Sequence, residues 1–318
     1  MTAYIARRLL MGLVVLVLVT LFVFLIMRLL PGDPLMLFVG QNELGTLTPE
    51  QLIELKHEYG LDKPLFTQYI LWVGGIFRGN LGYSIFNNES VTRMVKERLP
   101  ITFHLGVISL IISAVLGITF GVICALKRGR WQDTLFTVLA NMGITLPGFW
   151  VGILLIYVFS LKLGWLPTYG YTSPFIDIVT STRQIIMPVF CLTLFGIASL
   201  TRQTRSSMLE VIRQDYIRTA WAKGLRERLI IVRHTIKNAL IPVVTTIGMH
   251  VSLVFGGAVL IETIFNIPGM GRLMRDAVFT HDYQVVQGGV LIIALVIVLT
   301  NIAVDISYGW LDPRIRYS

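Results

Sequence analysis

The residues that could do chemistry gather in one charged segment, 201–242, which lies between two apolar runs. The basic residues there are Arg202, Arg205, Arg213, Arg218, Lys223, Arg226, Arg228, Arg233 and Lys237, and the acidic ones are Glu210, Asp215 and Glu227. Such charge is explained by a solvated loop that fixes the orientation of a membrane protein. It also suits a segment to which a partner outside the membrane docks, and charge alone leaves both interpretations open.

Local pattern divides this segment into a short bent loop. We expect a helix from Asp215 to Ala222, a turn at Gly224 and then a second apolar run. A short helix between two turns could pass a movement of a partner to the membrane helices. The sequence therefore predicts a docking element here.

Motifs for catalysis and for nucleotide or metal binding are missing from the sequence. It contains no G-x-x-x-x-G-K-[ST] loop, so we expect no ATP-binding site in this chain. Any energy from ATP would have to come from another protein. It has no H-E-x-x-H motif, its five histidines are scattered, and Cys124 and Cys191 both lie in apolar runs, as buried thiols do. We predict no catalytic, cofactor or metal site in this chain, which is not expected to be an enzyme.

Composition places the chain in a membrane. Of its 318 residues, 54% are hydrophobic and only 14% are charged, whereas soluble proteins have about 25% charged residues. The net charge of +9 would suggest nucleic acid as a partner in a soluble protein. Here the charge lies between apolar runs, so membrane lipid and not nucleic acid is the expected environment.

Apolar runs of membrane-spanning length predict an all-α, polytopic fold with six transmembrane helices. They lie near 9–30, 102–126, 134–161, 185–201, 239–264 and 285–307. With the N-terminus inside, the inner segments carry most of the Lys and Arg residues, which favours an N-in, C-in orientation. The predicted parts are a cytoplasmic N-terminus with the first span (1–30), an extracytoplasmic insert (31–100) and a five-helix core (101–318) with a cytoplasmic loop at 202–238.

The insert between the first two spans is expected to be helical. Thr48 and Pro49 resemble the start of a helix, and Gly60 resembles its end. The apolar stretch Leu65 to Phe77 should require burial.

The spans themselves contain helix-bending residues, among them Pro147, Gly148, Pro188 and Pro242, for which kinking is the expected role. Ionisable residues in the spans are few and lie near the ends: Arg28, Glu262 and Asp305. An ion-coupled carrier would normally keep acidic groups near the middle of the bilayer, which counts against that class.

Several short sequence motifs resemble those of a known family. Asp215–Leu225 (DYIRTAWAKGL) and Arg233–Pro242 (RHTIKNALIP) are similar to the cytoplasmic loop of the dipeptide, oligopeptide and nickel permeases of bacterial ABC importers. Arg218, Thr219 and Ala220 stand where the wider family has Glu-Ala-Ala, so its Glu is absent. Further matching words are Leu30–Pro34, Gly60–Pro64, Gly79–Gly82, Leu163–Pro167, Pro268–Gly271 and Asp312–Tyr317.

This resemblance implies a set of partners and a docking helix. The partners would be a second homologous permease, two cytoplasmic subunits that bind ATP and Mg, and an extracytoplasmic substrate-binding protein, all at the bacterial inner membrane. Tyr216, Ile217 and Ala220 would supply packing contacts to the ATP-binding subunit, and Arg218 and Lys223 polar ones. Asp215 and Thr219 complete the helix, and Gly224 supplies the turn.

The function expected from the resemblance is import of di- or oligopeptides. Nickel and glutathione permeases share the pattern and stay open as alternatives. An ATP-independent channel or secondary carrier is the competing class, and it would transport without an ATPase partner. No residue of the substrate pathway can be named from the sequence.

Overall fold

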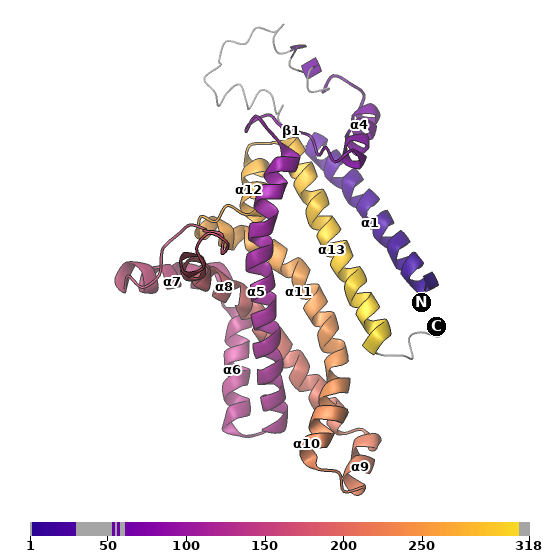
Figure 1. Cartoon of the computed structure of the whole chain (residues 1–318), viewed down its shortest axis with the longest axis vertical. Coiled ribbons are helices and arrows are strands. Elements are labelled where there is room, and N and C mark those ends of the chain that lie inside the picture. Colours follow the sequence, from indigo (N-terminus) through magenta and orange to yellow (C-terminus); the bar gives the residue numbers. More distant parts are fainter. Residues whose placement is uncertain (1, 30–52, 55, 58–60, 312–318) are drawn as a thin grey trace. The chain divides into compact units, whose positions relative to one another are not determined.

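The computed structural model describes residues 2–29, 53–54, 56–57 and 61–311, and this part of the chain is mostly helical. A single antiparallel pair, β1 (Tyr83–Ser84) with β2 (Glu89–Ser90), places Tyr83 opposite Ser90. The helices are α1 (Thr2–Leu29), α4 (Leu65–Phe77), α5 (Val91–Leu126), α6 (Trp131–Thr145), α7 (Gly148–Leu155), α8 (Ile178–Ile212), α9 (Asp215–Ala222), α10 (Glu227–Leu229), α11 (Lys237–Ile264), α12 (Met270–Phe279) and α13 (Tyr283–Leu311), with π-helical stretches η1 (Ile156–Lys162) and η2 (Ile230–Ile236) (Figure 1).

Among the described residues, five helices are long and apolar enough to cross a membrane. They are Ala6–Leu29, Val91–Leu126, Ile178–Ile212, Glu227–Ile264 and Tyr283–Ile306. Each covers one of the predicted apolar runs. A sixth crossing follows only if α6 and the helix from Gly148 to Lys162 count as one span, so the number six and the N-in, C-in orientation stay predictions.

The predicted third span, 134–161, is not one continuous helix. Its two halves meet at 99° across the break between Thr145 and Gly148. Leu146 has an extended backbone (φ −81°, ψ 123°), as expected for a residue before proline, because the Pro147 ring disfavours the helical conformation there. The position of the bend was predicted correctly, but its size was not.

The helix that contains the predicted second span begins before the apolar run. Helix α5 starts at Val91 and continues through Pro100, which the sequence had assigned to the end of the external insert. The first turns of α5 contain charged side chains, so hydropathy alone does not identify them as part of the helix. Arg93 forms ion pairs there, with Glu89 at 3.1 Å and with Glu97 at 2.9 Å. One interior proline removes a single helical hydrogen bond, which a long helix tolerates.

One compact unit consists of residues 6–101 and 268–298. Its core joins α1, α4, α12 and the adjoining ends of α5 and α13 (Figure 1), and includes Phe24, Trp72, Met270 and Val285. Of the apolar stretch 65–77, only Trp72 is buried, so the burial expected for this stretch holds on one side of α4 alone. The predicted helix between Thr48 and Gly60 lies largely outside the described residues.

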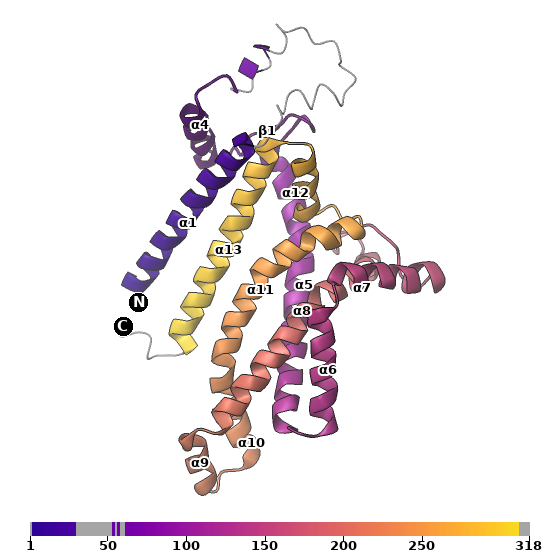
Figure 2. The same cartoon turned by 180° about the vertical axis from the view of Figure 1, so that it is seen from behind.

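The other unit contains residues 102–267 and the end of α13 from residue 299. Helix α8 packs against α6 and α11, which both views show (Figures 1 and 2). Glycines bring α5 and α6 close to α8: a Cβ at Gly121 would lie 2.7 Å from the Thr201 carbonyl oxygen, and one at Gly143 would lie 2.7 Å from the Leu194 carbonyl oxygen. Close contact through small residues is the usual way in which membrane helices associate.

A pair of Gly→Ala substitutions tests this packing. Gly121→Ala should lower the free energy of unfolding by about 1–3 kcal/mol because the methyl group overpacks the contact with α8. Gly256→Ala is the matched control, since no atom lies within 4 Å of its added Cβ. It should be neutral or stabilising. Thermal unfolding of the two purified variants in detergent measures the difference, and an equal effect of both would contradict the packing assignment.

Candidate functional site

Helix α9 occupies Asp215–Ala222, the bounds predicted for the docking element. Gln214 before it is extended (φ −70°, ψ 147°), and Asp215 places a carboxylate in the first turn, where the helix dipole favours negative charge. Gly224 ends the loop with φ +72°, a conformation that costs glycine little. The backbone N–H groups of Gly224 and Leu225 donate to the carbonyls of Trp221 (2.9 Å) and Ala220 (3.3 Å), which satisfies the helix end.

The inner face of α9 binds the helix to its own chain. Ile217 is fully buried and Ala220 is 8% exposed, and both pack with Ile230 of η2 and Val211 near the end of α8. The predicted role of Ile217 and Ala220 as contacts to a partner is therefore not supported: their side chains are already covered. The reason is their spacing of three, which places both on one face of the helix.

The exposed surface of α9, here called its outer face, carries one predicted aromatic residue and one that the sequence reasoning missed, and both flank the buried pair. Tyr216 is 45% exposed and Trp221 is 44% exposed. The predicted polar residues of the helix are also exposed: Asp215, Arg218, Thr219 and Lys223. Arg218 Nη1 lies 3.5 Å from Asp215 Oδ1. A large aromatic side chain in a strongly polar segment was the signal available for Trp221, because exposed aromatic residues are enriched at protein interfaces.

Tyr216 is oriented by the neighbouring helix. The side-chain amide of Asn238 donates to the Tyr216 hydroxyl at 3.2 Å and to the His234 carbonyl at 2.7 Å. Asn238 lies in the first turn of α11. The outer face thus has a polar connection to the span as well as the apolar one.

The link from α9 to the membrane span passes through η2. Residues 227–264 form one continuous helix that contains this π-helical stretch, and the Thr235 hydroxyl donates to the Ile230 carbonyl at 3.2 Å. Short π-helical segments are frequent at functional sites. The cluster around Ile217 thus joins α9 to residues of both α8 and η2.

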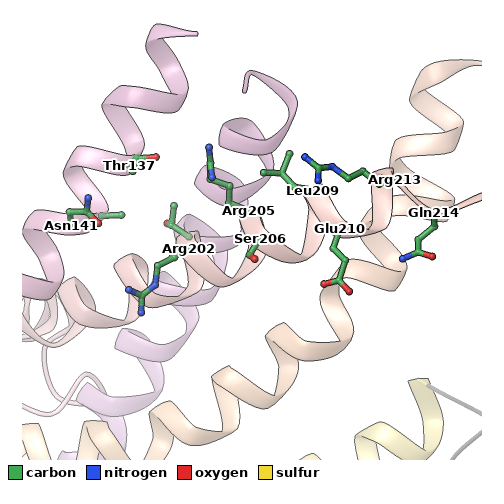
Figure 3. Close-up of a pocket in the computed structure, with 11 residues that line it drawn as sticks. Thr137, Asn141, Arg202, Arg205, Ser206, Leu209, Glu210, Arg213 and Gln214 are labelled. Carbon is green, nitrogen blue, oxygen red and sulfur yellow. The ribbon is translucent and has the colours of Figure 1, made fainter. Parts of the chain in front are cut away.

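A cavity of about 710 Å³ lies between α6 and α8. Figure 3 shows that Thr137 and Asn141 project from α6, and that the other labelled residues lie along α8 or, for Arg213 and Gln214, directly after its end. Near it, Arg205 binds Asp133 through two hydrogen bonds, Nε to Oδ1 at 2.8 Å and Nη2 to Oδ2 at 3.0 Å. Asp133 also accepts from the Gly129 N–H at 3.1 Å, so the turn between α5 and α6 is fixed to α8.

The described residues offer little for metal or redox chemistry. No group of three or more His, Cys, Asp or Glu side chains lies close enough to hold a metal ion in this part of the chain. Cys124 and Cys191 are free and buried, as predicted.

Two family models match the sequence. One, described as the inner membrane component of binding-protein-dependent transport systems, matches residues 117–317, and one for the N-terminal part of the membrane component of such systems matches residues 1–106. The di/tripeptide transport system permease protein DppB of Pseudomonas aeruginosa is 39% identical, with 100% of this chain and 99% of the relative covered. A relative from Brucella ovis, by name a peptide permease, is 41% identical with 99% of each covered.

Among solved structures, the inward-facing MetNI methionine ABC transporter has a similar fold. The TM-score is 0.53 at 15% identity, and the match covers 69% of this chain and 96% of that one.

The inner contact of α9 can be tested by limited proteolysis. Ile217→Ser should release the helix, since removing a buried Ile side chain costs about 2–5 kcal/mol. Trypsin should then cut after Arg218 and Lys223 faster than in the unchanged protein. Val232→Ser, which removes an apolar side chain that is 57% exposed in η2, is the control and should not alter the rate. Equal rates in all three proteins would show that Ile217 does not hold α9.

The ion pair between Asp133 and Arg205 can be measured by a double-mutant cycle. Asp133→Ala should destabilise the protein by about 1–3 kcal/mol, less than for a fully buried pair because the Arg205 side chain is 33% exposed. Arg205→Ala in the same background should then add little. Thermal unfolding of the four proteins provides the coupling energy, and additive effects would exclude a direct interaction.

Proposed function

Since the chain belongs to the family of inner membrane components of binding-protein-dependent transport systems, we propose that it is the permease subunit of an ABC importer for di- or oligopeptides. The observation that carries this proposal is similarity to peptide permeases along the entire chain, at about 40% identity. The sequence lacks an ATP-binding loop, which fits a subunit that depends on others for energy.

The proposed assembly contains a second homologous permease, two cytoplasmic ATP-binding subunits and an extracytoplasmic binding protein. ATP and Mg would bind to the ATPase subunits, not to this chain. The family description itself supports the need for a binding protein. In this assembly the exposed outer face of α9 is the surface offered to an ATPase subunit on the cytoplasmic side.

In the proposed mechanism α9 converts movement of the ATPase into movement of the spans. The outer face provides two aromatic side chains, Tyr216 and Trp221, which can fill pockets on the partner, with Arg218 and Lys223 as polar contacts around them. The inner face passes the displacement to α8 and to η2 through Ile217. Closure of the ATPases on ATP would then favour one of two arrangements of the spans.

The substrate class rests on the names of the relatives. Nickel and glutathione remain the alternatives that the sequence pattern allows. Uptake assays of the complete transporter with a dipeptide, glutathione and Ni²⁺ in competition separate the three. Competition by the dipeptide alone is the expected result.

Coupling is tested on the complex purified with its ATPase subunits and binding protein. Tyr216→Ala and Trp221→Ala should each reduce substrate-stimulated ATP hydrolysis by about tenfold, the effect of losing one strong interface contact. Gly224→Asp should insert normally and weaken the same coupling, because a side chain is strained at φ +72°.

Arg226→Gln is the matched control for these variants, because it removes an exposed charge from the same loop outside α9. It should retain full stimulation. If the chain purifies without ATPase subunits and transports nonetheless, the segment only orients the protein, and an ATP-independent carrier replaces the proposed function.

A further inference from the structure

A small polar pocket lies within the unit formed by residues 6–101 and 268–298. Its volume is about 170 Å³, and α1, α4 and α13 contribute Arg28, Trp72 and Gln287 to its walls. The motif Gly79–Gly82, which takes no part in the docking surface, also reaches it through Gly82, and Gln284 adds a further side chain. We call it the Arg28 pocket.

The guanidinium group of Arg28 is held rigidly at this pocket. Its Nε and Nη2 atoms both donate to the Gln68 side-chain oxygen, at 3.1 and 3.0 Å, and its Cζ lies 4.7 Å from the Phe24 ring centre and 5.0 Å from that of Tyr283. The third nitrogen, Nη1, is buried and has no hydrogen-bond partner. No carboxylate within the described residues forms an ion pair with Arg28, so its charge is left uncompensated by this part of the chain.

Among the described residues, two further N–H donors line the same pocket without partners, and the Gln284 side-chain oxygen is an unpartnered acceptor there. Gln287 is fully buried, and neither atom of its side-chain amide is hydrogen-bonded; Trp72 is 8% exposed, and its indole N–H is also unpartnered. A buried polar group without a hydrogen bond costs about 1–3 kcal/mol, and folded proteins satisfy nearly all of them. Three such groups in one pocket imply an occupant.

The chemistry of the donors selects the occupant. The space equals that of roughly five or six water molecules, each with a share of about 30 Å³. Water alone could satisfy the amide and the indole, but it would leave the charge of a half-buried guanidinium without a counterion. A carboxylate provides that negative charge, and its two oxygens suit an arginine and a neighbouring donor.

We propose that the Arg28 pocket binds a small carboxylate anion, held by Arg28 Nη1, the Trp72 indole N–H and the Gln287 amide. The anion joins the end of α1 to α4 and α13 in a region where the described side chains leave these donors unpaired. This inference does not depend on which substrate the transporter carries.

Thermal unfolding with acetate and with acetamide, at one ionic strength set with a bulky sulfonate salt, tests the proposal. Acetamide has the shape of acetate without its charge. For the full chain purified with its partner subunits, acetate should raise the unfolding temperature in a saturable way, as a ligand specific for the folded state does, and acetamide should not. Equal effects of the two compounds, or no saturation, would overturn the proposal.

Two substitutions assign the effect to the pocket. Arg28→Gln should abolish the response to acetate, whereas Arg78→Gln, which removes an exposed positive charge just after α4, should retain it. Gln287→Leu keeps the size and the charge of the pocket and should weaken acetate binding by about tenfold, the effect of one lost charge-assisted hydrogen bond. An unchanged response in both Arg28→Gln and Gln287→Leu would place the anion elsewhere.

Trp72 emission gives an independent readout and identifies the source of the carboxylate. In a chain with the other five tryptophans replaced by Phe, acetate should change the emission with the same midpoint as the thermal shift. Dialanine and its C-terminal amide form the second arm. A response to acetate but to neither of these identifies a free small anion; a response to dialanine and not to its amide identifies a peptide terminus. No response to any carboxylate would refute the site.

Discussion

Burial of Ile217 against Ile230 and Val211 is the contact on which the charged segment depends. Helix α9 is only eight residues long, too short to be stable alone in water. Burial of one Ile side chain supplies about 1.5–3 kcal/mol, enough to hold such a helix in one position only if neighbouring contacts assist. Ala220 and the hydrogen bond from Asn238 to Tyr216 provide that assistance. The helix is therefore a rigid part of two spans and not a flexible loop between them.

Helix α8 packs against neighbouring helices along its whole length within the unit formed by residues 102–267 and the end of α13. Small residues on α5 and α6 allow close approach in its middle, and Arg205 fixes the turn between α5 and α6 nearer to its end. Its last turn supplies Val211 to α9. Movement that begins at α9 thus meets a helix already packed on both sides. A body built in this way turns as one piece, which is the behaviour required of a span that moves between two discrete arrangements.

Local signals in the sequence were sufficient where one residue type determines the backbone. Gly224 marked the end of α9, and Pro147 marked the break after α6. They failed where distant residues decide. Which face of α9 is free depends on Ile230, and the angle of 99° depends on how α7 packs, with Phe265 beside Gly152. The Arg28 pocket lies further beyond prediction, because its donors come from residues 28, 72 and 287, which only the folded chain brings together.

The π-helical stretch η2 has a consequence for changes in chain length. A π-turn contains one residue more than an α-turn, so η2 takes up one extra residue without changing the phase of the helix on either side. Deleting one residue from 230–236 would restore an ordinary helix with the phase of the flanking residues unchanged, whereas a deletion in the α-helical residues 237–264 would rotate what precedes it by about 100°. Single deletions should therefore be tolerated within 230–236 and excluded from 237–264. The connection around 164–177, which carries no such phase relation, should accept them.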